Sequence, residues 1–183
     1  LLAAGSGPIY ALGKAFREGE YGRWHNPEFS LLEWYRPGFS LLALMQEVVA
    51  LVQALAPTVP TAIPEILTYQ AAFQRTLGLD PHQADTATLQ ATTAAQGIVW
   101  TGPALTRRGY LDLLLTHCIE PHLGQGRLTL LTEYPADQAA LARIRPGPIP
   151  VAERFELYWQ GLELANGFHE LSDPTEQAQR FAS

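Results

Sequence analysis

Apolar and polar positions alternate in two patterns along the chain, one typical of strands and one of helices. Two apolar and aromatic runs, residues 9–17 and 29–35, flank a loop that holds two glycines, Asn-Pro and most of the local charge. This arrangement predicts a β-hairpin with a polar tip. Leucine, methionine and valine then recur at helical spacing over residues 41–55, behind Ser40 as a possible cap, which predicts a helix that packs on the sheet.

The middle of the chain is predicted to be a mainly helical insert of about residues 65–125. Pro57, Pro60 and Pro64 disfavour regular structure before a short helix at 68–75 that ends at Gly78. The other elements expected from the pattern are a surface helix at 85–96, a buried helix at 109–119, a strand at 127–134, a short helix at 138–142 and a rigid loop at 145–150.

A second hairpin is predicted over residues 153–170, with Gln160-Gly161 as a two-residue turn. Such a turn pairs Trp159 with Leu162, Tyr158 with Glu163 and Leu157 with Leu164. Because side chains alternate between the two faces of a strand, Glu156 and Glu163 then share a face. Their backbones would lie roughly 7–8 Å apart across the ladder.

Glu156 and Glu163 have two possible interpretations at this spacing. Carboxylates on one face are hard oxygen ligands, and Mg²⁺ takes one or two of them together with water and substrate phosphates. The alternative is that both glutamates are ordinary solvated positions on an edge hairpin. The spacing alone does not choose between a metal site and a solvated face.

Composition limits the partners that this chain is expected to have. Its 183 residues, 47% of them hydrophobic and 16% charged, suffice for one globular domain, residues 1–183. Twelve basic and 18 acidic residues give a formal charge of −6, with no basic stripe, so nucleic acid is not an expected partner. No apolar stretch is long enough to span a membrane. The single cysteine, Cys118, and the lack of a leader pattern favour a cytoplasmic protein.

Phe16-Arg17 and the run from His25 to Phe29, His-Asn-Pro-Glu-Phe, carry a resemblance to a known family. They resemble motif 2 of the class II aminoacyl-tRNA synthetases, in the lysyl branch, and the likeness extends over nearly the whole chain. It implies an α+β fold, a mainly antiparallel sheet flanked by helices. It also implies that motifs 1 and 3 lie outside these residues, so that the core is incomplete and we expect the 183 residues alone to be inactive.

The resemblance assigns roles to individual residues. Arg17 would be catalytic, holding a carboxylate and a phosphate oxygen together, while Phe29 would stack on adenine. The positions implied to bind ATP are Arg17, Glu18, His25, Asn26, Phe29, Glu163 and Leu164. Those implied to bind the amino-acid substrate are Glu33, Tyr35 and Glu170, and Glu156 and Glu163 would hold Mg²⁺.

Each of these residue types also has an ordinary structural alternative. Arg17 alone would suit a surface ion pair, and Phe29 would suit a core position. His25 and Asn26 would suit a turn, and Glu33 and Tyr35 would suit a buried pair satisfied by its neighbours. We interpret the histidines His82, His117, His122 and His169 as structural or exposed, and Cys118 as buried, so zinc is not expected.

The sequence departs from the family pattern at one position, and at a second position it fits the pattern only if the strand is irregular. Gly19 occupies the position of the glutamate in the family's Phe-Arg-x-Glu pattern, which usually contacts the nucleotide, with Glu18 or Glu20 as possible substitutes. Strict alternation would put Glu170 on the face opposite Glu163, so its implied role requires a bulge or bend. Gly167 is the expected place for that irregularity.

The function implied by the resemblance is activation of (R)-β-lysine with ATP, followed by transfer to a lysine of elongation factor P. One alternative is a lysyl-tRNA synthetase core that charges tRNA with α-lysine. Another is a non-catalytic binding fragment. The family also implies a homodimer in the intact protein.

Overall fold

The computed structural model describes residues 1–19 and 21–182, so Glu20 lies outside the described residues. The chain forms two compact units, Leu1–Ser40 and Leu41–Ser183. The expectation of one domain over residues 1–183 stays a prediction.

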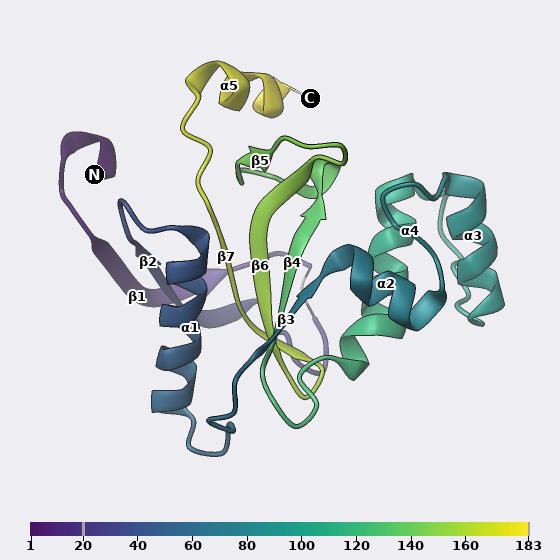
Figure 1. Cartoon of the computed structure of the whole chain (residues 1–183), viewed down its shortest axis with the longest axis horizontal. Helices are drawn as coiled ribbons and strands as arrows, with labels where there is room; N and C mark the ends of the chain where they lie inside the picture. Colours follow the sequence, from purple (N-terminus) through teal and green to yellow (C-terminus); the bar gives the residue numbers. More distant parts are fainter. Residues whose placement is uncertain (20, 183) are drawn as a thin grey trace. The chain divides into compact units, whose positions relative to one another are not determined.

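The first unit is a short 3₁₀ turn, η1 (Leu2–Ala4), followed by the predicted hairpin (Figure 1). Its strands β1 (Ile9–Phe16) and β2 (Glu28–Tyr35) run antiparallel. Eight consecutive pairs join them without a register shift, from Ile9 opposite Tyr35 to Phe16 opposite Glu28. The hairpin expected from the apolar pattern is confirmed.

A mixed five-stranded sheet forms the centre of the second unit. Its path runs β3, β4, β6, β5, and β7 pairs with β6. The pair β3–β4 is parallel, and the pairs of β6 with β4, β5 and β7 are antiparallel. The strands are β3 (Glu65–Thr68), β4 (Thr129–Pro135), β5 (Ile144–Arg145), β6 (Val151–Trp159) and β7 (Leu162–Phe168).

Helices begin where the sequence offers a side-chain cap. The side chains of Thr68, Asp85 and Thr106 each accept a hydrogen bond from a backbone N–H in the first turn of α2, α3 and α4. The α-helices of this unit are α1 (Leu41–Leu55), α2 (Tyr69–Leu77), α3 (Thr86–Ala95), α4 (Arg107–Leu114) and α5 (Pro174–Ala182). A π-helical segment, η2 (Leu115–Ile119), continues α4, and two 3₁₀ turns are η3 (Glu120–His122) and η4 (Ala136–Gln138).

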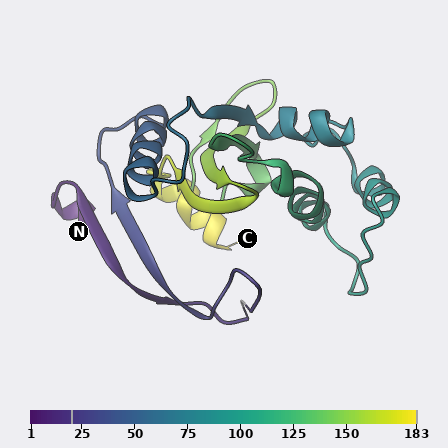
Figure 2. The same cartoon turned by 90° about the horizontal axis from the view of Figure 1, so that it is seen from below.

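Helices cover the two faces of the sheet unequally. In both views α1 lies on one side of the sheet and α2, α3 and α4 lie on the other (Figures 1 and 2). The larger core cluster includes Leu131, Tyr134 and Tyr158 of the sheet with Phe73 and Leu111 of the helices. The sheet face that carries Tyr158 is therefore the one covered by α2 and α4.

The structure corrects several expected elements. Strand β3 was missed because four residues among prolines are too short for a periodic pattern, and its one partner lies far along the chain. It also lies where the helical insert was expected to begin. The expected helix at 138–142 is wrong, because only the 3₁₀ turn η4 forms before Ala140 adopts a left-handed φ of 48°. Helix α5 was not predicted.

No helix in residues 1–19 and 21–182 is both long and apolar enough to cross a membrane.

Candidate functional site

One face of the β1–β2 hairpin gathers the predicted residues of motif 2. Phe29 lies opposite Ala15, and Glu33 lies opposite Ala11, so both side chains face small residues across the ladder. The Arg17 backbone N–H donates to the Pro27 carbonyl over 2.9 Å, which extends the ladder by one residue. Arg17, Phe29 and Glu33 therefore share one face of the hairpin.

Arg17 and Phe29 are in contact on that face. The guanidinium carbon of Arg17 lies 5.2 Å from the centre of the Phe29 ring, within cation–π range. Tyr35, opposite Ile9, closes the same face and is 38% exposed, and Glu33 is exposed. The alternative in which Glu33 and Tyr35 form a buried pair is therefore wrong in this unit.

The connection between the two strands runs over residues 17–27. Glu18, His25 and Asn26 all lie in it with exposed side chains. The Gly22 N–H donates to the His25 carbonyl over 3.1 Å, and Gly19 has a φ of 81°, a left-handed value. A glutamate at position 19 would be strained in this conformation. The loop geometry thus suits glycine at the position where the family pattern has glutamate.

The β6–β7 hairpin follows the predicted register for two pairs and then shifts. Trp159 lies opposite Leu162 and Tyr158 opposite Glu163, as expected, but Leu157 then lies opposite Ala165. Leu164 is therefore the extra residue of a β-bulge.

The bulge lies at Leu164 and not at Gly167, where it was expected. Gly167 pairs directly with Phe155, and a Cβ at this glycine would lie 2.6 Å from the Phe155 ring. Gly167 therefore makes room for an aromatic ring. The extra residue brings Asn166, opposite Glu156, onto the face of Glu163, and continued alternation carries Glu170 to that face as well.

Glu156 is buried in a polar cluster on the sheet face covered by helices. Glu156 is only 8% exposed to solvent. The hydroxyls of Tyr134 and Tyr158 donate to Oε2, the second over 2.6 Å, and the Arg154 guanidinium donates to Oε1. The same guanidinium lies 4.3 Å from the centre of the Tyr134 ring. A carboxylate with about four acceptor positions has three of them filled here.

Burial shifts the acid–base properties of this cluster. It raises the pKa of the Tyr134 and Tyr158 hydroxyls, and the nearby Glu156 charge raises both further. Both tyrosines therefore remain neutral hydrogen-bond donors at physiological pH. The cluster holds Glu156 in one orientation.

Glu163 and Glu170 are exposed, in contrast to Glu156. The Asn166 side-chain amide donates to Glu163 Oε1 over 3.4 Å. Partial burial raises the pKa of the Glu170 carboxyl, and Glu170 forms an isolated bridge with Ala142. Leu164, the bulge residue, is 39% exposed.

The carboxylate oxygens of Glu156 and Glu163 suit part of the ligand shell of one Mg²⁺ ion. Glu163 offers an exposed carboxylate, and Glu156 has one acceptor position left, on Oε1. Mg²⁺ needs only one or two protein carboxylates when phosphates and water complete its shell. Among the described residues, no group of three or more His, Cys, Asp or Glu side chains is arranged to hold a metal ion by itself.

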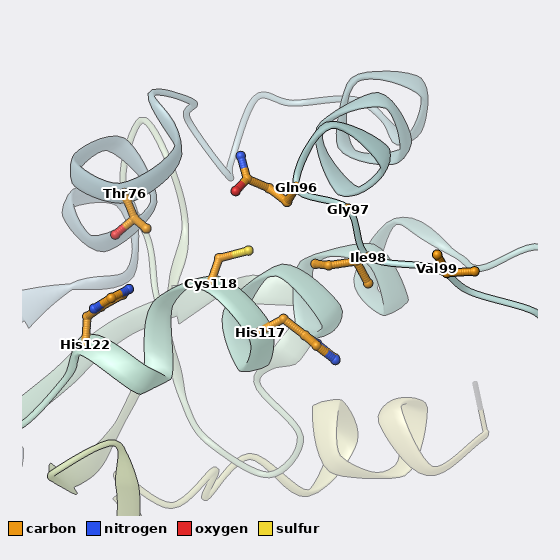
Figure 3. Close-up of a pocket in the computed structure, with 8 residues that line it drawn as sticks. All are labelled: Thr76, Gln96, Gly97, Ile98, Val99, His117, Cys118 and His122. Atoms are coloured by element: carbon orange, nitrogen blue, oxygen red, sulfur yellow. The ribbon is translucent and has the colours of Figure 1, made fainter.

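A separate pocket of about 560 Å³ lies among the helices of the second unit. Cys118, His117, His122 and Thr76 line it together with the Gln96–Gly97 segment (Figure 3). The Cys118 side chain points toward Gln96, and the His117 ring points away from Cys118 (Figure 3). Cys118 is thus half-buried and lines a pocket, instead of being buried as expected.

Known proteins are similar to this sequence over nearly its whole length. The family model of the class II tRNA synthetases (D, K and N) matches residues 1–183. The chain belongs to the class II tRNA synthetase family. Relatives of this class II synthetase chain include proteins named elongation factor P–(R)-β-lysine ligase from Salmonella arizonae, Vibrio cholerae and Pseudoalteromonas translucida, at 47%, 49% and 50% identity. Each match covers 99% of this chain and 55% of the relative.

The class II synthetase chain therefore spans about half the length of the curated relatives that it matches. Its predicted site residues fall in both units: Arg17, Phe29 and Tyr35 in the first, Glu156, Glu163 and Glu170 in the second. Their convergence on one cleft stays a prediction. The ATP, substrate and metal roles of these residues stay predictions too.

Sequence reasoning missed the residues that surround Glu156 in this class II synthetase chain. Arg154 and Tyr158 are two positions from Glu156 on β6, so strand alternation places them on its face and could have found them. Tyr134 comes from β4, and Glu120 comes from the helical segment, to which no chemistry was assigned. The pairing of distant elements, which only the fold reveals, brings these two residues to the cluster.

Proposed function

We propose that the intact gene product activates (R)-β-lysine with ATP and transfers it to a lysine side chain of elongation factor P. The observation that carries this proposal is 47–50% identity over 99% of the chain to proteins named for that reaction. A protein that works on elongation factor P would act in the cytoplasm. The proposal includes a homodimer, as the family resemblance implies.

Arg17 and Phe29 suit the first step of this reaction. Activation requires in-line attack of the amino-acid carboxylate on the α-phosphate of ATP, with release of pyrophosphate. A planar guanidinium can hold the attacking carboxylate and a phosphate oxygen at once and neutralise the charge that develops between them. The Phe29 ring, in contact with Arg17, would present a face for adenine. The exposed loop with Glu18, His25 and Asn26 would contact the rest of the nucleotide.

The β6–β7 face would supply the metal and ammonium ligands. Glu163, with Glu156 behind it, would hold Mg²⁺ beside the phosphates, and Leu164 would line the nucleotide. A bound Mg²⁺ would neutralise phosphate charge during transfer. Glu33, Tyr35 and Glu170 would receive the substrate amines, because a carboxylate and a phenol both accept hydrogen bonds from an ammonium group.

The test is amino-acid-dependent exchange of pyrophosphate into ATP by the intact gene product, with (R)-β-lysine and α-lysine compared at equal concentration. We expect faster exchange with (R)-β-lysine. Mass spectrometry of elongation factor P after reaction should then show one β-lysyl group on a lysine side chain. A variant of elongation factor P in which the acceptor lysine is replaced by arginine is the matched control.

Two outcomes would replace this proposal with another. Exchange that prefers α-lysine, together with charging of tRNA, would indicate a lysyl-tRNA synthetase core. Absence of exchange with either amino acid would indicate a binding protein without catalysis.

A further inference from the structure

Glu120 lies outside every predicted motif but reaches the polar cluster around Glu156. Its Oε1 atom lies 3.2 Å from the Tyr158 hydroxyl oxygen. That hydroxyl also donates to Glu156 Oε2 over 2.6 Å. Tyr158 therefore stands between a carboxyl group of the helical segment and the buried carboxylate of the sheet.

The Tyr158 hydroxyl is the donor in both contacts. A tyrosine hydroxyl carries one proton, so Glu120 and Glu156 share it, and the shorter contact is the one to Glu156. Burial raises the pKa of the Glu120 carboxyl, and the hydrogen bond that it accepts from Tyr158 lowers that pKa. Tyr158 therefore links the two carboxyl groups through a single proton.

Backbone hydrogen bonds fix the segment that carries Glu120 against the turn of the β6–β7 hairpin. The Gly161 N–H donates to the Leu123 carbonyl over 2.8 Å, and the Gln160 N–H donates to the Gly124 carbonyl over 3.0 Å. Glu120 thus has a defined place relative to Tyr158, two residues before that turn.

We propose that Glu120 is a positioning residue, acting through the Tyr158 hydroxyl to orient the Glu156 carboxylate for nucleotide binding. This inference rests on the proposed function, because it assumes that Glu156 belongs to the ATP site. Glu120 itself touches neither nucleotide nor amino acid. The chain of contacts runs from the Glu120 carboxyl to the Tyr158 hydroxyl and on to Glu156 Oε2.

The test uses pyrophosphate exchange by the intact gene product with four variants. Glu120→Met removes the carboxyl acceptor at similar side-chain size, and Tyr158→Phe removes the bridging hydroxyl. We expect each to lower kcat/KM for ATP by about tenfold, mainly through KM, because a hydrogen bond to a charged group is lost. The double variant should lose no more than either single variant. Glu120→Gln keeps a side-chain oxygen that can accept from Tyr158 and should restore most of the loss.

Two controls separate positioning from general damage. Glu65→Gln alters a partly buried glutamate on β3 that pairs with Arg75 and Arg127, and it should leave KM for ATP unchanged. Calorimetric titration with ATP and Mg²⁺, without amino acid, should reproduce the order of the variants as an order of affinities. A defect of folding would instead lower the active fraction and kcat while KM stays constant.

Independent losses that multiply in the double variant would overturn the proposal, as would a Glu120→Gln protein no better than Glu120→Met. If Glu120→Met does not fold, Tyr158→Phe decides: unchanged kcat/KM in a folded protein overturns the proposal. If the wild-type protein is active and the variants give these contrary results, only the positioning role is refuted. An inactive wild type refutes the proposed function as well.

Discussion

The two hairpins of this chain follow the same strand alternation but depend on their surroundings to different degrees. The β1–β2 hairpin keeps one register over eight pairs, and Tyr10, Leu12 and Phe16 on one face are each at least 70% exposed. The β6–β7 hairpin contains a bulge, and Phe155, Leu157 and Tyr158 of β6 are fully buried. Within its own unit, the regular ladder of the first hairpin aligns these residues.

This difference shows where local sequence information stops. A turn and alternating side chains are sufficient to bring Arg17, Phe29 and Glu33 to one face. They are not sufficient to orient Glu156, because one of its hydrogen-bond partners, Tyr134, comes from β4. The second hairpin should therefore be sensitive to changes in the elements that pack against it.

The largest expected effect is on stability at Gly124. It has a φ of 72°, and a Cβ there would lie 2.5 Å from Trp159 Cα and 2.6 Å from the Tyr158 carbonyl oxygen. Because both neighbours are backbone atoms, we expect Gly124→Ala to lower the free energy of unfolding by more than about 3 kcal/mol. Urea denaturation measures this change.

Gly126 and Gly13 provide matched controls. Gly126 has a similar φ of 76° but no heavy atom within 4 Å of a new Cβ, so Gly126→Ala should cost only the conformational strain, about 1 kcal/mol. Gly13, in β1, has neither positive φ nor a close neighbour, and Gly13→Ala should be nearly neutral. Equal losses at Gly124 and Gly126 would show that the turn of the second hairpin does not depend on close packing.

The next effect concerns activity and the first hairpin. Arg17→Lys keeps the charge but loses the planar fork that can hold two oxygens. We expect kcat/KM for pyrophosphate exchange to fall about a hundredfold, or about 2.7 kcal/mol of transition-state stabilisation. Arg75→Lys, in an ion pair with Glu65 on the second unit, is the control and should retain activity. A loss of less than threefold at Arg17 would exclude a bidentate role.

A smaller effect is expected from Glu163 on the second hairpin. Glu163→Gln removes an exposed charge and keeps the shape, so the fold should be unchanged. Weaker metal binding should reduce exchange by at least about tenfold, or about 1.4 kcal/mol. Glu176→Gln on α5, where the carboxylate accepts a bond from Arg180, controls for loss of surface charge. An unchanged rate at saturating Mg²⁺ would favour the solvated-face interpretation.

The smallest effects are pH slopes of opposite sign at two glutamates of the second unit. Hydrogen bonding from Arg143 lowers the pKa of Glu153, whereas burial raises that of Glu120. The stabilisation from Glu153 is present above the unfolded-state pKa and is lost as pH falls. The contribution from Glu120 is present below the unfolded-state pKa and is lost as pH rises through the raised value.

Denaturation series of the two Gln variants from about pH 4 to pH 7 test these slopes. The stability of Glu153→Gln relative to wild type should decrease as pH rises, and that of Glu120→Gln should increase. Slopes of the same sign would contradict the assigned environments.

Sequence reasoning located both hairpins because, in each, two arms patterned with period two flank a connection that contains glycine and polar residues. It placed Tyr158 opposite Glu163 correctly, since the Gln160-Gly161 turn sets that register. It placed the bulge wrongly at Gly167, because the packing of the Phe155 ring against that glycine is a tertiary contact. The cluster around Glu156 could not be predicted in full, since Tyr134 and Glu120 reach it only through the assembled sheet.

The parallel pairing of β3 with β4 has a consequence for how the chain folds. Thr129 Oγ1 donates to Glu65 Oε2 across 64 positions of sequence. The whole α2–α4 segment must therefore be brought into a closed loop before these strands can align. Local hairpins form in microseconds, whereas pairing over such separations is slow because loop closure costs entropy first. Strand β3 should be among the last strands to join the sheet, leaving the adjoining edge of β4 open to intermolecular pairing during refolding.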